Sequence, residues 1–337
     1  MRAVALGGGH GLAATLGALR LMPEVSDVTA VVTVADDGGS SGRIRREIGG
    51  LLPPGDLRMA LAALAHEPGW TELVQHRFGG TGALAGHAVG NLVLAGLMET
   101  LGDPVAALDA MCELLGVRGR VLPMCAVPLD IEAEVSGLDP EGEDAADAAD
   151  AGRTHRIRGQ VAVASTPGRV ERVRLLPEDP PACTQAVEAV RAADLVLLGP
   201  GSWFTSVLPH LLVPALRAAL QETAARRVVV LNLAPEPGET PDFSPEQHLA
   251  VLAAHAPELR FDVVLADSGS VAVPRRLRRE AETMMGAGGR VHLAPVAAGP
   301  LVPRHEPTAL AAALREVLSG PPGGPGAATR PRSGAST

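Results

Sequence analysis

The residues best suited to chemistry lie in one loop, Asp36 to Arg43, directly after a run (31–34) that predicts a buried strand. The loop combines two acids, three glycines, two serines and one arginine. Glycines let backbone N–H groups approach a ligand, hydroxyls donate hydrogen bonds, and carboxylates bind a ribose hydroxyl or a metal ion. The loop therefore predicts a site for a phosphorylated or nucleotide ligand. Its candidate binding residues are Asp36, Asp37, Gly38, Gly39, Ser40, Ser41 and Arg43.

Similar turns follow apolar runs at three other places, after residues 4–6, 195–198 and 228–231. Short apolar runs that end in glycine are typical of parallel strands, which helices bury on both faces. In such sheets ligands bind outside the carboxyl ends of the strands, so we expect these turns to converge on one crevice. The candidate binding residues that the turns add are Gly8, Gly9, His10, Gly11, Gly199, Gly201, Ser202 and Asn232.

Three further candidates are marked by residue type. Asparagine occurs only at Asn91 and Asn232, which suggests that its paired donor and acceptor are needed there. The structural alternatives are a helix cap at Asn91 and a turn at Asn232. In the turn 53–58, Asp56 could cap a following helix over 57–66. Arg58 would then lie in a first helical turn, where its charge opposes the helix dipole, so it points to an anion or an acidic loop nearby.

The basic residues restrict how a phosphate could be bound. All 29 are arginine, because the chain contains no lysine, and tyrosine is absent as well. A P-loop lysine and a Schiff-base lysine are therefore excluded. Phosphates must be met by backbone N–H groups, hydroxyls and arginine.

Charge and cysteine usage exclude several function classes. The net charge of −9 argues against nucleic acid as the main partner, and the basic cluster 275–279 predicts a solvated helix face. We find no secretory signal and no run of membrane-spanning length, so we expect no membrane insertion. Three scattered cysteines predict neither a disulfide framework nor a zinc site, which fits a cytoplasmic protein. A homo-oligomer is compatible with the sequence, which does not decide the oligomeric state.

The pattern of elements predicts an α/β fold with a parallel sheet flanked by helices. Strands are expected at 3–7, 28–35, 194–199, 227–232, 262–267 and 291–293, with helices between them, including one continuous helix over 206–222. We expect one domain over residues 1–318. Within it, residues 119–180 should form a β-rich elaboration with a disordered acidic loop at 136–153, and residues 319–337 a disordered tail.

Seven motifs, in order over roughly residues 1–300, resemble the YvcK-type gluconeogenesis factor family within the CofD-like superfamily. They are GGGHGL (7–12), VTVADDGGSSGR (32–43), LPPGDLR (52–58), GHAVGNL (86–92), GRVLPM (119–124), LGPGSWFTSVLP (198–209) and NLAPEPGET (232–240). The resemblance implies a modified Rossmann-like domain that binds a UDP-sugar such as UDP-N-acetylglucosamine in the cytoplasm. It also implies a regulatory role in gluconeogenic growth, cell shape and peptidoglycan precursor supply. A superfamily relative, 2-phospho-L-lactate transferase, uses a guanosine-diphospho donor and magnesium.

The chain departs from the family pattern at several positions. His10 stands where threonine is usual, Met59 where asparagine is typical, and Glu236 where glutamine is usual. Trp203-Phe204 replaces a common Leu-Tyr pair. These departures bear on the contacts around base and sugar more than on the phosphate site.

Three functional hypotheses follow. In the first, a nucleotide-sugar-binding regulator, Gly9 and Gly11 bring a helix N-terminus to the diphosphate, and the turn 199–202 forms a second anion nest. Asn91 and Asn232 would then bind sugar or base, and one acid of the first loop a ribose hydroxyl.

In the second hypothesis, a transferase, Asp36 and Asp37 hold Mg²⁺ while Arg43 or Arg58 balances charge. In the third, an oxidoreductase, residues 9–14 fit GxGxxA and Asp36 lies roughly where a ribose-binding acid belongs.

Overall fold

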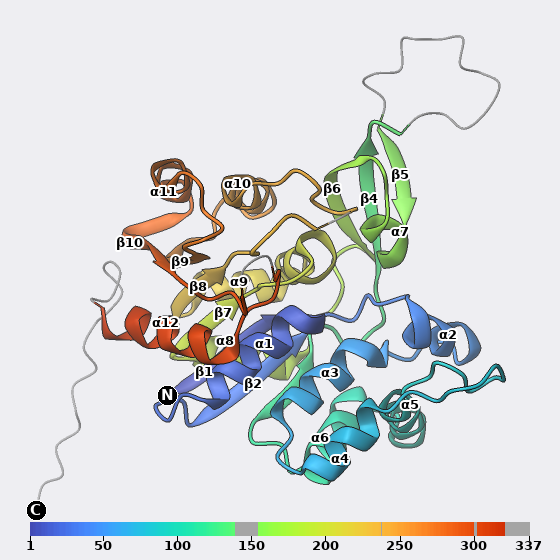
Figure 1. Cartoon of the computed structure of the whole chain (residues 1–337). Helices are drawn as coiled ribbons and strands as arrows, with labels where there is room; N and C mark the ends of the chain where they lie inside the picture. The colour runs from blue at the N-terminus through green and yellow to red at the C-terminus, as the bar shows by residue number, and fades with distance from the viewer. Residues whose placement is uncertain (139–153, 237, 300–301, 321–337) are drawn as a thin grey trace, which may run out of the picture.

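The computed structural model describes residues 1–138, 154–236, 238–299 and 302–320. Within these residues, parallel strands form a central seven-stranded sheet in the order β10-β9-β8-β7-β1-β2-β3 (Figure 1). The strands are β1 (Arg2–Gly7), β2 (Asp27–Val32), β3 (Arg120–Pro123), β7 (Leu195–Leu198), β8 (Arg226–Val230), β9 (Phe261–Asp267) and β10 (Met285–Ala294). Every residue of β7 is buried, as expected for a continuous apolar run in the middle of a parallel sheet.

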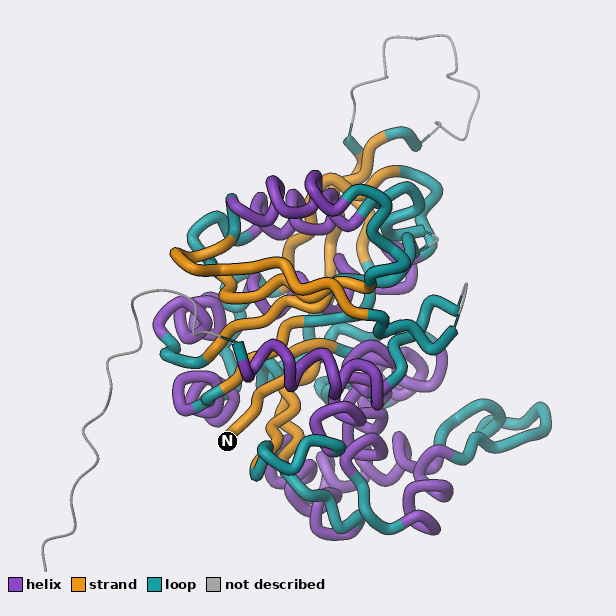
Figure 2. The backbone as a smooth tube through the Cα atoms, turned by 60° about the vertical axis from the view of Figure 1, so that its left-hand side comes forward, coloured by secondary structure: helices purple, strands orange, loops and turns teal. Residues whose placement is uncertain are grey.

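Helices cover both faces of this sheet, so the strands form the middle layer (Figure 2). Their bounds are α1 (Gly9–Arg20), α2 (Gly39–Glu47), α3 (Pro54–Leu64), α4 (Pro68–Gln75), α5 (Val89–Leu101), α6 (Pro104–Leu114), α8 (Thr184–Ala192), α9 (Pro214–Glu222), α10 (Pro245–His255), α11 (Pro274–Glu282) and α12 (Pro307–Ser319). Helix α1 packs against α3 and α12, whereas α8 pairs with α9 and α10 with α11. Apolar residues from both layers and the sheet form one continuous core.

The strand order reverses between β1 and β7. From β1 the chain adds β2 and β3 on one side, and then returns to add β7 on the other side. Loops that leave the carboxyl ends of β1 and β7 therefore lead to opposite faces and leave a crevice between them. This confirms the expectation that the glycine turns after these strands meet at one edge of the sheet.

A second, antiparallel sheet lies beside the first. It consists of β5 (His155–Arg158), β4 (Asp130–Ser136) and β6 (Arg169–Leu176) in that order, with the short helix α7 (Gln160–Ala164). Strand β4 alternates buried apolar residues with more exposed ones, because only one face meets the core. Strand β3, inside the range expected for the elaboration, belongs to the central sheet. Of the expected disordered segments, residues 139–153 and 321–337 lie outside the described residues.

Two helix starts determine where candidate residues lie. Helix α1 begins at Gly9, so His10 and Gly11 lie in its first turn. Helix α3 begins at Pro54 with Pro53 at the N-cap, so the expectation that Asp56 caps this helix was wrong. Proline is favoured at the first helical position, and the start moves upstream for that reason. Asp56 remains in the first turn, where an acid suits the helix dipole.

The continuous helix expected over 206–222 was also wrong. The chain instead forms a π-helical turn at Trp203–Val207, a 3₁₀ segment at Leu208–Leu212, and then α9. Pro209 and Pro214 lack backbone N–H groups, which prevents one continuous helix. Among the described residues no single helix is long and apolar enough to span a membrane, and the one pair that reaches the length is bent by 78°.

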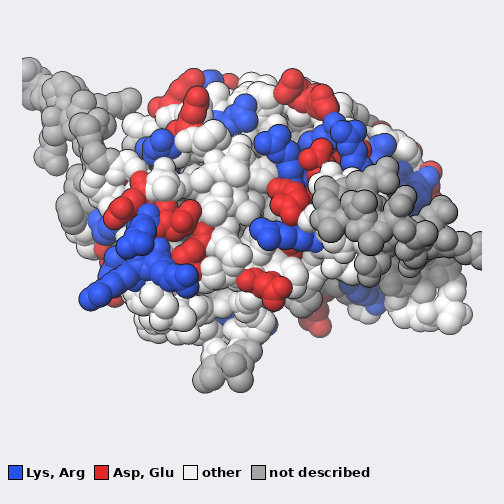
Figure 3. Space-filling view, turned by 90° about the horizontal axis from the view of Figure 1, so that it is seen from above, with Lys and Arg blue, Asp and Glu red and all other residues white. Residues whose placement is uncertain are grey.

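The basic cluster expected on a solvated helix face lies on α11. Its four arginines are exposed, while Leu277 on the opposite side is buried, which confirms the expectation. The face of the molecule seen in Figure 3 carries acidic and basic side chains interspersed, with one larger basic cluster.

Candidate functional site

The glycine turns that follow β1 and β7 touch each other at the crevice between these two strands. A Cβ atom added to Gly11 would lie 2.2 Å from the carbonyl oxygen of Pro200, so only glycine permits this approach. Gly8 is the N-cap residue of α1 and has no side chain to cap the helix, whereas the Asp56 carboxyl accepts a hydrogen bond from the Gly9 backbone N–H. The N–H groups at the start of α1 therefore form a positively polarised end beside the second turn.

Acidic and hydroxyl side chains from neighbouring loops surround the glycine turn after β1. A Cβ at Gly8 would lie 2.5 Å from Asp56 Oδ2 and 2.6 Å from Thr33 Cγ2. A Cβ at Gly55 would lie 2.5 Å from both Asp36 Oδ2 and Ser41 Oγ. The crevice thus joins the loops after β1 and β2 to the start of α3, and it holds Asp36 and Asp56 close together.

The electrostatics of this cluster are unusual for carboxylates. Burial, and secondarily the negative charge of Asp36, raise the pKa of Asp56 to about 7. Burial also lowers the pKa of Arg58, helped by Arg77 and opposed by the two acids. Asp56 therefore changes protonation near neutral pH, which is a property of functional sites.

A buried hydrogen-bond network connects Arg58 to the loop after β2. Arg58 Nε donates to Asn91 Oδ1 (2.9 Å), and Asn91 Nδ2 donates to Ser40 Oγ (2.9 Å). Ser40 Oγ also lies 2.9 Å from His87 Nδ1. Arg58 is only 4% exposed, and within the described part of the chain no carboxylate forms an ion pair with it. A buried cation of this kind is a candidate partner for a ligand anion.

Asn91 is the third residue of α5, whose N-cap is Ala88. The helix-cap alternative for Asn91 was therefore wrong. Both ends of its amide are used inside the protein, where they fix the guanidinium of Arg58 relative to Ser40.

In the loop after β2, three candidate side chains form hydrogen bonds with backbone groups of the protein. Asp37 Oδ1 accepts from the Val161 N–H at the start of α7 (2.9 Å). Arg43 donates to the carbonyl oxygens of Ala85 (2.7 Å) and Ala83. The Gly38 N–H donates to Asp36 Oδ1 (2.9 Å) and so fixes that carboxylate. Gly39 follows within the first turn of α2, where φ is +44°.

The glycine turn after β7 is held by the loop after β8. Asn232 accepts from the Gly201 N–H (3.0 Å) and donates to the Gly201 carbonyl (2.9 Å), so its amide shapes the turn. Gly199 has a φ of +74°, which favours glycine. Ser202 precedes the π-helical turn as its N-cap residue.

The N-terminus of that π-helical turn is already occupied by an acidic side chain. Glu239 accepts from the Phe204 N–H (3.0 Å) and from the Thr205 hydroxyl. Glu236 lies close to Ser202 and Trp203, and these contacts partly offset the upward shift of its pKa. Carboxylates thus occupy the start of the π-helical turn beside the second expected anion nest, and Asp56 in the same way meets the Gly9 N–H at the start of α1.

A pocket of about 240 Å³ lies against the two turns. Its lining includes His10, Gly11, Pro200, Gly201, Glu236 and His305. Neither Glu236 nor His305 was among the sequence candidates. Glu236 was marked only as a departure from a family pattern, and His305 had no signal, because it follows an ordinary loop near the last helix.

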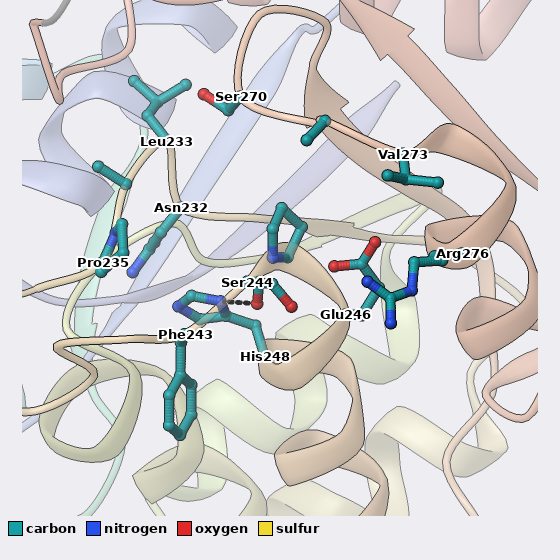
Figure 4. Close-up of a pocket in the computed structure, with 13 residues that line it drawn as sticks. Asn232, Leu233, Pro235, Phe243, Ser244, Glu246, His248, Ser270, Val273 and Arg276 are labelled. Carbon is teal, nitrogen blue, oxygen red and sulfur yellow. Dashed lines mark hydrogen bonds between the residues drawn. The ribbon is translucent and has the colours of Figure 1, made fainter.

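A second pocket, of about 260 Å³, continues from the first along the residues 232–235 (Figure 4). Phe243 and Val273 make part of its lining apolar, and Glu246 and Arg276 lie together at one side (Figure 4). His248 is buried there and contacts the Ser244 carbonyl through Nδ1 (2.9 Å). Its ring meets Trp203 and Phe243 edge-on, which accounts for its position as a packing residue.

The acids provide limited ligation for a metal. Among the described residues, no group of three or more His, Cys, Asp or Glu side chains is arranged to hold an ion. Asp36 and Asp56 are the acids that face each other across the crevice, whereas Asp37 is turned to α7. Mg²⁺ commonly uses one or two carboxylates together with substrate phosphates and water, so this pair suits magnesium bound with a phosphorylated ligand.

Comparisons with known proteins agree on one family. The family model described as 2-phospho-L-lactate transferase CofD matches residues 3–288. The "Putative gluconeogenesis factor" of Mycobacterium tuberculosis is 60% identical over 323 residues, covering 94% of this chain and 90% of the relative. The "Gluconeogenesis factor" of Bacillus subtilis is 38% identical over 277 residues, covering 82% and 81%. A crystal structure of a UPF0052-family protein from Bacillus halodurans matches with a TM-score of 0.80 and 31% identity, over 93% of this chain and 99% of that one.

The family model extends over the central sheet from β1 to the start of β10 and over all the glycine turns. They confirm the resemblance that the seven motifs indicated. They also confirm the expected fold, a parallel sheet flanked by helices with an additional β-sheet. The chain therefore belongs to the CofD family, among its YvcK-type gluconeogenesis factors.

Proposed function

We propose that this protein is a cytoplasmic regulator that binds a nucleotide-sugar of the UDP-N-acetylglucosamine type. Its diphosphate would meet the start of α1 in the crevice between β1 and β7. The observation that carries this proposal is the convergence there of the N-terminus of α1, two glycine turns in close contact and the buried Arg58, which forms no ion pair among the described residues. Helix N-termini and arginine are the phosphate-binding groups left to a chain without lysine.

The individual candidates take different parts in this proposal. Gly8, Gly9, His10 and Gly11 would contact the diphosphate, and Arg58 would balance its charge. Asp36 would accept from a ribose hydroxyl or hold Mg²⁺. Asn91, Asn232, Asp37 and Arg43 would position these groups, because their hydrogen-bond partners are protein atoms.

Calorimetric titration with UDP-N-acetylglucosamine, with and without Mg²⁺, tests the proposal. We expect saturable binding of UDP-N-acetylglucosamine and weaker binding of a plain sugar phosphate. Neither heat nor a thermal shift up to millimolar ligand would contradict it.

The relatives named gluconeogenesis factor favour a role during growth on gluconeogenic carbon sources. We expect a strain without this gene to grow on glucose, but to lose normal cell shape and growth on gluconeogenic substrates. Restoration by the parent gene but not by a Gly11→Ala gene would tie that role to the crevice. Equal restoration by both genes would separate the role from ligand binding.

A second candidate function is transfer of a phosphorus-containing group from a nucleoside-diphosphate donor with Mg²⁺. The paired acids Asp36 and Asp56, and the pKa of Asp56 near 7, favour it specifically. Release of free nucleotide from a nucleotide-sugar, measured by phosphorus NMR and abolished by Asp56→Ala, would support this reading. If the ligand binds but no turnover is detected, the transferase function is excluded and the regulator function stands. The dinucleotide alternative rests on the spacing of residues 9–14 and on the position of Asp36.

A further inference from the structure

The hydrogen-bond chain that starts at Arg58 has a direction that chemistry fixes. A guanidinium donates hydrogen bonds and never accepts them. The Asn91 atom that lies 2.9 Å from Arg58 Nε must therefore be the amide oxygen, which leaves the amide NH₂ group to donate to Ser40 Oγ. Ser40 then has its own hydroxyl proton to donate, and His87 Nδ1 lies 2.9 Å from its oxygen. The chain thus ends at His87, which was not among the sequence candidates.

The last step of the chain depends on where the His87 ring carries its proton. Burial, and then the positive charge of Arg43, lower the pKa of His87. Arg77 acts in the same direction, whereas Glu47 opposes these effects. The ring is therefore neutral at physiological pH. If its one proton were on Nδ1, the Ser40 oxygen would face two donors, and the Ser40 hydroxyl proton would have no acceptor among the described residues. A proton on Nε2 satisfies every step of the chain.

The backbone holds the His87 ring at the end of the chain. The His87 N–H donates to the Leu84 carbonyl (3.0 Å), and the His87 carbonyl accepts from the Phe78 N–H (3.0 Å). Arg43 connects the same loop to α2, the helix that carries Ser40. His87 is buried as well. Because both partners lie on elements joined by other hydrogen bonds, His87 can fix the direction of the Ser40 hydroxyl.

At the other end of the chain, the Arg58 side chain is held along its stem and at Nε. A Cβ atom added to Gly90 would lie 3.0 Å from Arg58 Cδ and 2.9 Å from Val74 Cβ, so α5 packs closely on the stem. Nε is bound to Asn91. The two terminal nitrogens have no hydrogen-bond partner in the described part of the chain, and they are not among its enclosed polar atoms. Their N–H groups are therefore available to a ligand anion.

We propose that His87 is a positioning residue of the ligand site: its Nδ1 accepts the Ser40 proton and, through Asn91, fixes the Arg58 guanidinium toward the diphosphate. This inference rests on the proposed nucleotide-sugar function and adds a residue that acts through Arg58. The Ser40 hydroxyl is then committed to His87 and not to the ligand. Without an acceptor at residue 87, that hydroxyl turns to another partner, and the amide that holds Arg58 loses its fixed orientation.

A double-mutant cycle measured by calorimetry tests the proposal. His87→Phe keeps an aromatic ring but removes the acceptor, whereas His87→Asn keeps an acceptor close to the position of Nδ1. We expect His87→Phe to weaken binding of UDP-N-acetylglucosamine about tenfold, as for the loss of one hydrogen bond, and His87→Asn to retain most of the affinity. Asn91→Leu interrupts the chain before Arg58, so His87→Phe should cause no further loss in that background. Full additivity of the two losses, or unchanged affinity of His87→Phe, would overturn the proposal.

Nitrogen-15 NMR of the histidine-labelled parent protein adds a test that needs neither a ligand nor a stable variant. The spectrum distinguishes a protonated ring nitrogen from an unprotonated one, and the signals missing in His87→Asn identify those of His87. We expect His87 to be protonated on Nε2 and unprotonated on Nδ1 at neutral pH. A proton on Nδ1 at that pH would overturn the proposed chain.

Two controls accompany the affinities. His66→Phe changes an exposed histidine outside the crevice and should leave the affinity for UDP-N-acetylglucosamine unchanged. Thermal unfolding of each variant verifies that it is folded. If the parent protein binds no nucleotide-sugar, the proposed function itself fails, whereas the proton position on His87 still decides whether the chain ends there.

Discussion

Gly11 controls how closely the turns after β1 and β7 approach each other. Replacement by alanine would place Cβ 2.2 Å from the Pro200 carbonyl oxygen, so one turn must move. We expect Gly11→Ala to weaken UDP-N-acetylglucosamine binding by more than tenfold, because the diphosphate groups lose their common position. Calorimetry measures this loss, and a thermal scan measures the accompanying fall in melting temperature.

Gly96→Ala is the matched control for this change. Gly96 also lies inside a helix, α5, but nothing stands within 4 Å of an added Cβ. Alanine there should stabilise the helix by up to about 1 kcal/mol and leave ligand affinity unchanged. Equal behaviour of the two variants would show that the contact between the turns is unimportant for binding.

Asp56 should make stability depend on pH in a direction opposite to an ordinary salt-bridged acid. Its folded-state pKa of about 7 lies above the ordinary value of 3.8, so the folded protein binds this proton more tightly than the unfolded chain. The cost of ionising Asp56 is absent below pH 4, grows as pH rises, and is complete above pH 7. For a shift of about three units this cost reaches at most roughly 4 kcal/mol.

Asp56→Asn removes that cost. We expect the melting temperature of the variant minus that of the parent to increase steadily from pH 5 to pH 8. Buried His210 and His305, whose pKa values are lowered to about 4, favour the folded state as pH rises, but they do so equally in both proteins. A difference that stays constant across this range would rule out a raised pKa at Asp56.

The glycines and acids of the crevice were predictable from sequence, because turn chemistry is local and their spacing after apolar runs is visible. His305 and Glu236 were not. They line the pocket beside the glycine turns because the loop after β8 and the segment before α12 fold together there. Likewise, Asn232 was singled out correctly as unusual, yet its partner, the Gly201 backbone, required the structure.

At the scale of elements, helix α7 lies between two loops of the site. Asp37 binds its first turn, while a Cβ at Gly238 would lie 1.9 Å from the Ala164 carbonyl at its other end. The loop after β2 and the loop after β8 therefore both pack on α7. Asp37 therefore binds α7, whereas its neighbour Asp36 faces Asp56 across the crevice. The sequence left open how the two acids differ.

Asp37→Ala should release α7 without removing a ligand contact. We expect faster hydrogen exchange at the amides of residues 161–164, a loss of about 1 kcal/mol as for a helix cap, and little change in ligand affinity. Asp36→Ala should do the reverse, with α7 protection retained and affinity reduced. Exchange measurements and calorimetry on both variants decide the matter; the opposite pattern would return the ligand role to Asp37.

Element types were largely predictable and element ends were not. The pair Asp103-Pro104 is typical of a helix start, and α6 begins there, with Asp103 accepting from the Val105 N–H (2.8 Å) and Pro104 at the first position. In the segment 203–222 the apolar pattern wrongly indicated one continuous helix. Pro209 and Pro214 break the helix there, although the side chains are mostly buried. Burial there follows from tertiary packing and carries no information about helix continuity.

On the scale of the whole molecule, one apolar core runs through the central sheet, both helical layers and the antiparallel sheet. We therefore expect a single cooperative unfolding transition in calorimetry. Ligand at a hundred times its dissociation constant should stabilise the protein by about 2.7 kcal/mol and raise the melting temperature by roughly 5 °C. Two separate transitions, with only one responding to ligand, would contradict a shared core.

The order of strands in the sheet could not be read from the sequence. Apolar runs and glycine turns predicted parallel strands with converging carboxyl ends, and the family resemblance predicted a Rossmann-like arrangement. The position of the reversal, between β1 and β7, depends on where the chain returns after β3. That reversal is what brings together turns separated by nearly two hundred residues.

A crystal structure of the protein soaked with UDP-N-acetylglucosamine and Mg²⁺ tests the central claim most directly. The account predicts a diphosphate within hydrogen-bond distance of the backbone N–H groups of Gly9, His10 and Gly11, with the Arg58 guanidinium facing it. Ligand density at any other surface, with the start of α1 left open, would contradict it.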